Sequence, residues 1–302
     1  MRLRLGTRGS ALARAKAELV RAILEARHVG LRVELVFIRT TGDRLTRGPL
    51  PAGGKGLFVK EIDEALLAGT VDVGVHSMKD LPARLASGLL LAAVPARADP
   101  RDLLIAGGAG GLEALPNRAR VGTASPRRRA QLLARRADLQ VVPVRGNVDT
   151  RLRRWRAGGE LDALVLAAAG LARLGVAEPA ARPLDPAEFV PAVGQGALAL
   201  VCRAADGATR EILAAVADPA AQAAVAAERA FLLAIGGDCN TPLAAHASVT
   251  DGQVALRVWV SDPDGRRALD ASERAPVADA AALGRALAER LIVRGAAEIM
   301  AR

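Results

Sequence analysis

The chain has 302 residues, and 51% of them are hydrophobic, which is enough for two or three domains with packed cores and excludes a disordered protein. No apolar run is as long as a membrane span, and the N-terminus lacks a signal-peptide core, so we expect a soluble, cytoplasmic protein. Two distant cysteines, Cys202 and Cys239, and three scattered histidines indicate neither a disulfide framework nor a metal site.

The net charge of +10 is concentrated in one segment. Between Arg118 and Arg156 there are twelve arginines and only two aspartates, so this segment alone carries a charge equal to that of the whole chain. Such a segment should attract anions, and nucleic acid is the default partner. Aromatic residues are only 2% of the chain, however, tyrosine is absent, and no zinc-finger or heptad pattern is visible. Arginine is equally suited to binding carboxylates through two parallel hydrogen bonds.

The first part of the chain predicts alternating strands and helices. Ser10 fits the N-cap of the first helix, and Gly69 ends the second. The polar loop 40–54 between them is long enough to be a mobile lid or disordered. The expected elements are strand 2–7, helix 11–27, strand 31–38, helix 56–68, strand 71–76 and strand 89–94.

The stretch Val71–Pro82, V-D-V-G-V-H-S-M-K-D-L-P, carries the first candidate for chemistry. Its three valines alternate with other residues as in a strand, and the alternation stops at Ser77, where a polar cluster with Lys79 and Asp80 follows. Open α/β sheets place their active sites just past such strand ends. Taken alone, the Lys-Asp pair also fits a solvated turn.

A second series of strands and helices follows a polar, proline-containing stretch, 95–102, which is a candidate domain crossing. Ser125 fits an N-cap and Pro126 the first position of a helix. The Gly-Thr turn and Ser cap at 6–10 recur here at 122–125. Because helix N-termini bind anions, two such turns suggest two halves that face each other across a cleft. The expected elements are strand 120–123, helix 126–136, strand 140–144, helix 147–157 and strand 162–167.

The last third predicts a return crossing and a small α+β domain. Residues 189–200 should cross back and form a strand that ends at Cys202, a buried core thiol. Helices are expected over 207–216, 220–235 and 277–301, with strands over 243–249, 254–260 and 266–273. The expected domains are therefore residues 1–96 with 197–216, residues 97–196, and residues 217–302.

Cys239 lies in a tight G-G-D-C-N-T-P loop between the last long helix and the first of these strands. A cysteine in such a loop is either an ordinary surface residue or a nucleophile or attachment point. The neighbouring Asp238 would not lower the pKa of the thiol, so the residues alone leave both interpretations open.

Nine stretches, in order and nearly end to end, together resemble the porphobilinogen deaminase family, also called hydroxymethylbilane synthases. No single stretch is decisive, but nine in order are highly specific. They are G-T-R-G-S (6–10), G-G-K-G-L-F-V-K-E (53–61), V-H-S-M-K-D-L-P (75–82), D-P-R-D (99–102), V-G-T-A-S-P-R-R (121–128), R-G-N-V-D-T-R-L (145–152), A-A-G-L-A-R-L-G (168–175), P-A-V-G-Q-G-A-L (191–198) and G-G-D-C (236–239).

The resemblance implies two α/β domains like those of periplasmic binding proteins, joined by two crossings, and a small α+β C-terminal domain. It implies a transferase of porphyrin and haem biosynthesis that condenses four porphobilinogens head to tail with loss of ammonia. A dipyrromethane cofactor would be attached to Cys239 through a thioether, and we expect a monomer without nucleic-acid, membrane or metal partners.

The resemblance also assigns roles to individual residues. Asp80 would be the catalytic carboxylate. The residues that match cofactor-binding positions are Cys239, Lys79, Thr123, Ser125, Arg127, Arg128 and Arg145. Those that match substrate-binding positions are Arg8, Ser10, Lys55, Phe58, Arg151, Arg173 and Gln195. The chain departs from the family pattern at Ala124 and Pro126, and in the G-G-D-C loop, where G-G-C is common.

Two other classes of protein compete with this interpretation. A non-catalytic binding protein for an anionic solute fits the paired turns and the arginines, but it does not account for Cys239. A nucleic-acid binder fits only the basic charge. The mass of the intact protein separates the three, because only the enzyme should be heavier than its sequence by a dipyrrole.

Overall fold

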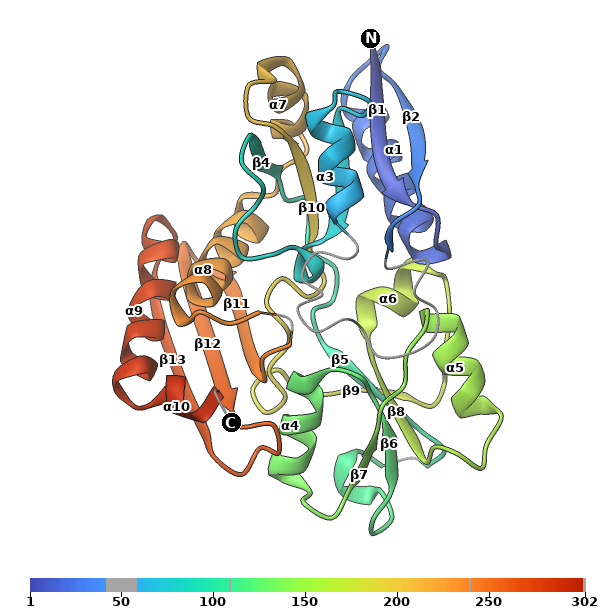
Figure 1. Cartoon of the computed structure of the whole chain (residues 1–302), viewed down its shortest axis with the longest axis vertical. Helices are drawn as coiled ribbons and strands as arrows, with labels where there is room; N and C mark the ends of the chain where they lie inside the picture. Colours follow the sequence, from blue (N-terminus) through green and yellow to red (C-terminus); the bar gives the residue numbers. More distant parts are fainter. Residues whose placement is uncertain (42–58, 109, 239, 301–302) are drawn as a thin grey trace. The chain divides into compact units, whose positions relative to one another are not determined.

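The computed structural model describes residues 1–41, 59–108, 110–238 and 240–300. Contacts divide the chain into two compact units, drawn in Figure 1. Unit 1 holds Met1–Ala98 and Ala197–Gln222, and unit 2 holds Asp99–Gly196 and Ala223–Arg302. The chain therefore passes from one unit to the other three times. The expected division into three domains stays a prediction, as does the cleft.

Unit 1 is built on a five-stranded sheet in the order β2-β1-β3-β10-β4. The strands β1, β2 and β3 are parallel, and β10 runs antiparallel to both β3 and β4. The strands are β1 (Arg2–Arg8), β2 (Arg32–Ile38), β3 (Val73–Ser77), β4 (Leu89–Ala93) and β10 (Leu198–Arg203). The helices are α1 (Ala11–Arg27), α3 (Lys60–Leu67) and α7 (Gly207–Ala214), with a 3-10 turn, η1 (Met78–Asp80), after β3.

The central strand β3 is buried on both faces. Val73 and Val75 pack in the core with the apolar face of α1, while Gly74 faces α3 on the other side. A Cβ at Gly74 would lie 2.9 Å from Ile62 of α3, so glycine permits the close approach of this helix. Gly74 and His76, which alternate with these valines, are therefore interior as well, since helices cover both sides of the strand.

Helix α1 begins and ends as predicted. Ser10 caps it, because its Oγ accepts a hydrogen bond from the backbone N–H of Ala13 at 3.3 Å. The buried residues of α1 are Ala13, Lys16, Ala17, Val20 and Leu24. One of these five is a lysine, which lies on an otherwise apolar face.

Unit 2 contains a second five-stranded sheet, in the order β7-β6-β8-β5-β9. As in unit 1, three parallel strands come first and the fourth is antiparallel, which agrees with the repeated turn seen in the sequence. The strands are β5 (Asp102–Ala106), β6 (Arg120–Gly122), β7 (Gln140–Val142), β8 (Ala163–Ala167) and β9 (Ala181–Pro183), and the helices are α4 (Pro126–Arg135), α5 (Val148–Arg156) and α6 (Ala168–Arg173).

The C-terminal part of unit 2 is a three-stranded antiparallel sheet, β11-β12-β13, with its own helices. The elements are α8 (Pro219–Ile235), β11 (Leu243–Thr250), β12 (Gln253–Ser261), β13 (Ala268–Pro276), α9 (Ala280–Val293) and α10 (Ala296–Met300). The expectation of one helix over 277–301 is wrong, because a 3-10 turn at Val277–Asp279 precedes α9 and Gly295 ends it with a φ of +92°.

Two α/β sheets and a small α+β C-terminal part are the predicted fold class, which is confirmed. In the part of the chain that the structure describes, no helix combines the length and the apolarity that a membrane span needs.

Candidate active site

The predicted catalytic stretch lies at the carboxyl edge of the unit 1 sheet. Strands β1 and β3 are parallel neighbours, so Arg8 at the end of β1 and Ser10 after it share this edge with Ser77, the last residue of β3, and with Lys79 and Asp80 after it. The chain goes from β1 to β2 on one side and reaches β3 on the other, which makes this edge the topological switch point of the sheet.

The turn η1 fixes how the polar cluster is presented. Met78 is fully buried, and its N–H donates to the carbonyl of Ala197 at 3.1 Å, which ties η1 to the start of β10. Lys79 is half-buried, and Asp80 is exposed. The carboxylate of Asp80 is therefore held at a firmly anchored turn and can be reached from solvent.

A small pocket lies at this edge, and three charged residues line it: Arg8, Lys16 and Asp80. The other lining residues are Ala13, Val59, Ile62, Val75, His76 and Ser77. The Nζ of Lys16 donates to the Oγ of Ser77 at 2.8 Å, and only 7% of Lys16 is exposed. Lys16 was not among the predicted site residues, although its position on the apolar face of α1 was a signal that could have found it.

His76 stands in this pocket as a buried, uncharged imidazole. The pKa of His76 is lowered to about 4, first by burial and then by the positive charge of Lys16, while Asp80 opposes both. The two ionic side chains are thus close enough to His76 to act on its proton.

The carboxyl edge of the unit 2 sheet gathers most of the other predicted residues. Thr123 and Ser125 follow β6, Arg145 follows β7, and Arg173 ends the helix after β8. Ser125 caps α4 by accepting from the N–H of Arg128 at 3.4 Å, while the Oγ1 of Thr123 accepts from the N–H of Ser125 at 3.2 Å. The second Gly-Thr turn is therefore built as predicted.

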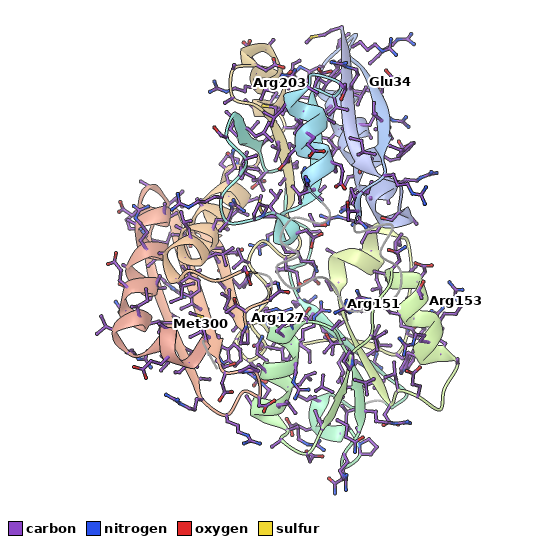
Figure 2. The ribbon with its side chains drawn as sticks, viewed as in Figure 1. Glu34, Arg127, Arg151, Arg153, Arg203 and Met300 are labelled. Atoms are coloured by element: carbon purple, nitrogen blue, oxygen red, sulfur yellow. The ribbon has the colours of Figure 1, made fainter. Side chains whose placement is uncertain are left out.

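Arg127 and Arg128 are not surface groups, because both bind the buried carboxylate of Asp102 at the start of β5. Arg127 lies 2.8 Å from Oδ2 of Asp102, and Arg128 donates to Oδ1 at 2.7 and 3.0 Å. The amide of Gln195 donates to the same Oδ1 at 2.9 Å. Burial lowers the pKa of Arg127, although Asp102 opposes this. Figure 2 labels Arg127 within this region of the ribbon.

Asp102 is 0% exposed, and the predicted sites did not include it. Its signal was the D-P-R-D motif, whose last residue starts β5. Two guanidinium groups share this single carboxylate, so the cluster keeps a net positive charge at the edge of the sheet.

The arginine-rich segment is largely neutralised within unit 2. Its ion pairs are Arg120–Asp162, Arg129–Asp264, Arg136–Asp138, Arg153–Asp149, Arg154–Glu160 and Arg156–Glu178. The positive charge that can attract an anion is therefore concentrated at the carboxyl edge of the sheet. Arg145 is exposed there, and the Nε of Arg151, labelled in Figure 2, donates to the carbonyl of Gly146.

Among the described residues, Arg173 is the clearest cation without a carboxylate partner. It is half-buried, and it donates to the carbonyl of Gly196 at 2.6 Å. Its buried Nε has no hydrogen-bond partner, and no carboxylate in the described part of the chain pairs with it. Burial alone lowers the pKa of this guanidinium. A bound carboxylate would relieve that cost, so the residues of this edge fit a polyanionic group.

Three predicted residues, Lys55, Phe58 and Cys239, lie outside the described residues, as does most of the 40–54 loop. Next to Cys239, the Oδ1 of Asp238 accepts hydrogen bonds from the N–H of Asn240 at 2.9 Å and from the hydroxyl of Thr241 at 3.1 Å. The carboxylate of Asp238 therefore forms hydrogen bonds within its own turn.

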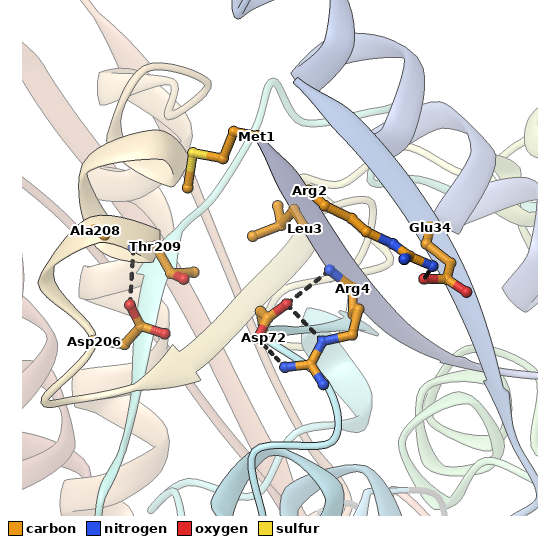
Figure 3. A pocket seen from close by; sticks show the side chains of 9 residues that line it. All are labelled: Met1, Arg2, Leu3, Arg4, Glu34, Asp72, Asp206, Ala208 and Thr209. Atoms are coloured by element: carbon orange, nitrogen blue, oxygen red, sulfur yellow. Dashed lines mark hydrogen bonds and ion pairs between the residues drawn. The ribbon is translucent and has the colours of Figure 1, made fainter. Parts of the chain in front are cut away.

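A larger pocket of about 500 Å³ lies at the opposite, amino end of β1 (Figure 3). Its charged side chains already have partners: Arg2 pairs with Glu34, Arg4 with Asp72, and Asp206 accepts from the N–H of Thr209. The larger volume therefore does not identify the reaction site, because the charged side chains of this pocket already pair within the protein. Within the described residues, no cluster of His, Cys, Asp and Glu could hold a metal ion.

The fold and the two polar edges define an α/β protein with a carboxylate beside cations at one sheet edge and an arginine-lined edge on the other sheet. Residues 3–211 match the family model described as "Porphobilinogen deaminase, dipyromethane cofactor binding domain", and residues 222–293 match "Porphobilinogen deaminase, C-terminal domain". The chain belongs to the porphobilinogen deaminase family.

Relatives cover the chain almost completely. Porphobilinogen deaminase from Rubrobacter xylanophilus is 51% identical over 301 residues, 99% of this chain and 96% of the relative. The one from Syntrophotalea carbinolica is 49% identical over 300 residues, 99% of this chain and 95% of the relative. The family resemblance and the prediction of a transferase are confirmed, and the non-catalytic binding protein is not favoured.

Solved structures similar to the chain are distant from it. The methionine binding protein MetQ covers 71% of this chain and 89% of its own at 15% identity, with a TM-score of 0.43. YhfZ from Shigella flexneri covers 78% and 91% at 20% identity, with a TM-score of 0.36.

Proposed function

We propose that this chain condenses four porphobilinogen molecules head to tail, releases ammonia at each step and yields the linear tetrapyrrole hydroxymethylbilane. One observation carries the proposal: in a chain of this family, Asp80 stands exposed at the switch point of the unit 1 sheet, beside Arg8 and Lys16. This is the position where an α/β sheet presents a reactive carboxylate.

Asp80 is the residue that acts on the reacting carbon. When ammonia leaves the aminomethyl group of porphobilinogen, positive charge develops on the pyrrole, and a nearby carboxylate stabilises it. The same carboxylate accepts a hydrogen bond from the pyrrole N–H and carries the proton that the new carbon–carbon bond displaces. Its exposure allows this contact, and the anchored turn η1 keeps the carboxylate in place.

A dipyrromethane held by a thioether to Cys239 supplies, when bound, the pyrrole that begins the chain and keeps partial chains attached. The residues that would hold it are Lys79, Thr123, Ser125, Arg127, Arg128 and Arg145. Arg127 and Arg128 are nearly buried and tied to Asp102, so they act chiefly through the positive charge that their cluster retains. Tethering replaces a two-body encounter with an intramolecular one.

The substrate is bound by a second set of residues. This set is Arg8, Ser10, Lys55, Phe58, Arg151, Arg173 and Gln195. Arg173 is best prepared for the task, because its buried Nε lacks a partner in the described part of the chain. Gln195 is 1% exposed and donates to Asp102, so it contributes to this set by ordering the arginine cluster.

The protein acts as a cytoplasmic monomer on a small-molecule substrate, without nucleic acid. The ion pairs that neutralise most of the arginine-rich segment support the absence of nucleic acid, because they leave little free charge for a phosphate backbone.

The test is turnover of purified protein with porphobilinogen. We expect one ammonia for each porphobilinogen consumed, and a product that closes spontaneously to a porphyrinogen, which is followed by absorbance after oxidation. Protein that carries a bound dipyrrole by mass but leaves porphobilinogen unchanged would contradict the proposal.

A further inference from the structure

We propose that Lys16 is a positioning residue for Asp80: its ammonium group prevents His76 from becoming a cation that would pair with the Asp80 carboxylate and withdraw it from the substrate. The inference rests on the function proposed above.

The geometry brings three elements together at one pocket. Lys16 enters from α1, His76 and Ser77 from the end of β3, and Asp80 from η1. The Nζ of Lys16 is fixed by its 2.8 Å hydrogen bond to Ser77, the residue directly after His76. Burying a charged ammonium costs free energy. The buried ammonium of Lys16 lines the same pocket as Asp80, the only carboxylate among the described lining residues.

His76 is the group on which Lys16 acts. It is 4% exposed, and its Nε2, which lies against Gly74, has no hydrogen-bond partner in the described residues. If His76 took up a proton, Asp80 in the same pocket would be the compensating charge, because it already raises the pKa of His76 against burial and Lys16. The resulting imidazolium–carboxylate pair would neutralise the charge that the reaction needs.

The other charges around His76 do not replace Lys16. Arg8 at the end of β1 and Lys79 on η1 add positive charge at the same edge, and β10 is apolar from Leu198 to Val201. On α3, Glu61 accepts hydrogen bonds from Thr41, and burial followed by the charge of Glu64 raises the pKa of Asp63 to about 6. Asp63 therefore titrates within the acidic pH range of the turnover test, so that test uses a variant without its carboxylate.

The first arm of the test measures the imidazole directly. The chain has only three histidines, so nitrogen-15 labelled histidine gives three titrating signals that His76→Gln assigns. In Lys16→Met we expect the pKa of His76 to rise by about one unit, because one nearby like charge is removed. Lys16→Arg restores the parent value, and Lys60→Met, which removes an exposed lysine of α3, leaves it unchanged. An unchanged His76 titration in Lys16→Met overturns the proposal; if that variant does not fold, Lys16→Gln is measured by the same criterion.

The second arm measures turnover against pH in the Asp63→Asn background. Lys16→Met should match the background near pH 7 and fall below it by about twofold near pH 5, as the fraction of charged His76 grows with a one-unit shift. Equal loss at every pH indicates a merely structural role and overturns the proposal. If the parent protein does not consume porphobilinogen, the proposed function fails, while the imidazole titration still decides the role of Lys16.

Discussion

At the scale of single residues, two carboxylates at the two sheet edges have opposite surroundings. Asp80 is exposed beside cations, and Asp102 is 0% exposed and bound by Arg127 and Arg128. An exposed carboxylate can meet a substrate, whereas a buried one shared by two guanidinium groups holds them in place. We therefore propose that the same residue type serves the reaction at one edge and the architecture at the other.

Asp80→Asn keeps the shape of the side chain and removes its charge. We expect turnover of porphobilinogen to fall by about 100-fold or more, since charge stabilisation at the reacting centre is lost, while the free energy of unfolding is unchanged. Steady-state kinetics and urea unfolding measure the two quantities. Asp264→Asn, which removes an exposed aspartate paired with Arg129, is the matched control with normal turnover. Turnover of Asp80→Asn near the parent rate would refute the catalytic assignment.

Asp102→Asn leaves two buried guanidinium groups without their carboxylate. We expect the free energy of unfolding to fall by about 3–5 kcal/mol, because an uncompensated buried charge is more costly than a lost surface pair. Asp99→Asn breaks the partly exposed pair with Arg101 and should cost less than about 1 kcal/mol. Chemical unfolding of the two variants compares them, and equal losses would show that the Asp102 cluster does not stabilise unit 2.

At the scale of elements, His76 on β3 and Asp63 on α3 have opposite effects on how the free energy of unfolding changes with pH. The pKa of His76 is lowered to about 4, so the unfolded chain takes up this proton first as the pH falls, and stability is lost between about pH 6.5 and pH 4. The pKa of Asp63 is raised to about 6, so the folded chain takes up that proton first, and stability is gained as the pH falls from about 6 to 4.

His76→Gln should therefore remove an acid-dependent loss of stability. Between pH 7 and pH 5 the parent should lose about 2 kcal/mol through His76, partly offset by about 1 kcal/mol from the half-buried Asp63. The loss disappears in His76→Gln and becomes steeper in Asp63→Asn. Urea unfolding at the two pH values measures it, and an identical pH dependence in the parent and His76→Gln would contradict the assignment.

The hairpin turns of the C-terminal sheet offer a second test at this scale. Gly252 and Gly265 have φ values of +71° and +70°, but only Gly265 is crowded, since a Cβ there would lie 2.1 Å from the carbonyl oxygen of Ala130 in α4. Gly252→Ala should cost about 1 kcal/mol of unfolding free energy for backbone strain alone. Gly265→Ala should cost about 1–3 kcal/mol more because it also forces the turn away from α4. Equal costs in thermal or chemical unfolding would show that this turn does not pack on α4.

At the scale of the whole molecule, local signals predicted most elements, and packing decided the rest. The Ser caps of α1 and α4 and the apolar periodicity of the long elements placed their ends within a few residues. Strand β5 was missed because it directly follows a polar crossing, and β9 because it is a three-residue edge strand that ends in proline. The break at Gly295 was lost within an otherwise helical pattern.

The positions of the candidate site residues could be predicted from the sequence only in part, for the same reason. Residues next to strand ends, such as Asp80 and Ser125, follow from the chain order, because parallel strands end at one edge. Lys16 and Asp102 act through side chains buried between elements far apart in sequence, and no local pattern shows which buried charge meets which partner. That part of the site depends on tertiary packing.

We propose that a polyacid is tethered to this chain and lengthened at Asp80. Mass spectrometry of the intact protein tests it most directly, before and after addition of porphobilinogen, with Cys239→Ser measured beside the parent. We expect a parent heavier than its sequence by one dipyrrole, further species each heavier by one porphobilinogen less ammonia, and an unmodified Cys239→Ser. A parent whose mass equals that of its sequence before and after substrate, with a free thiol at Cys239, would contradict it.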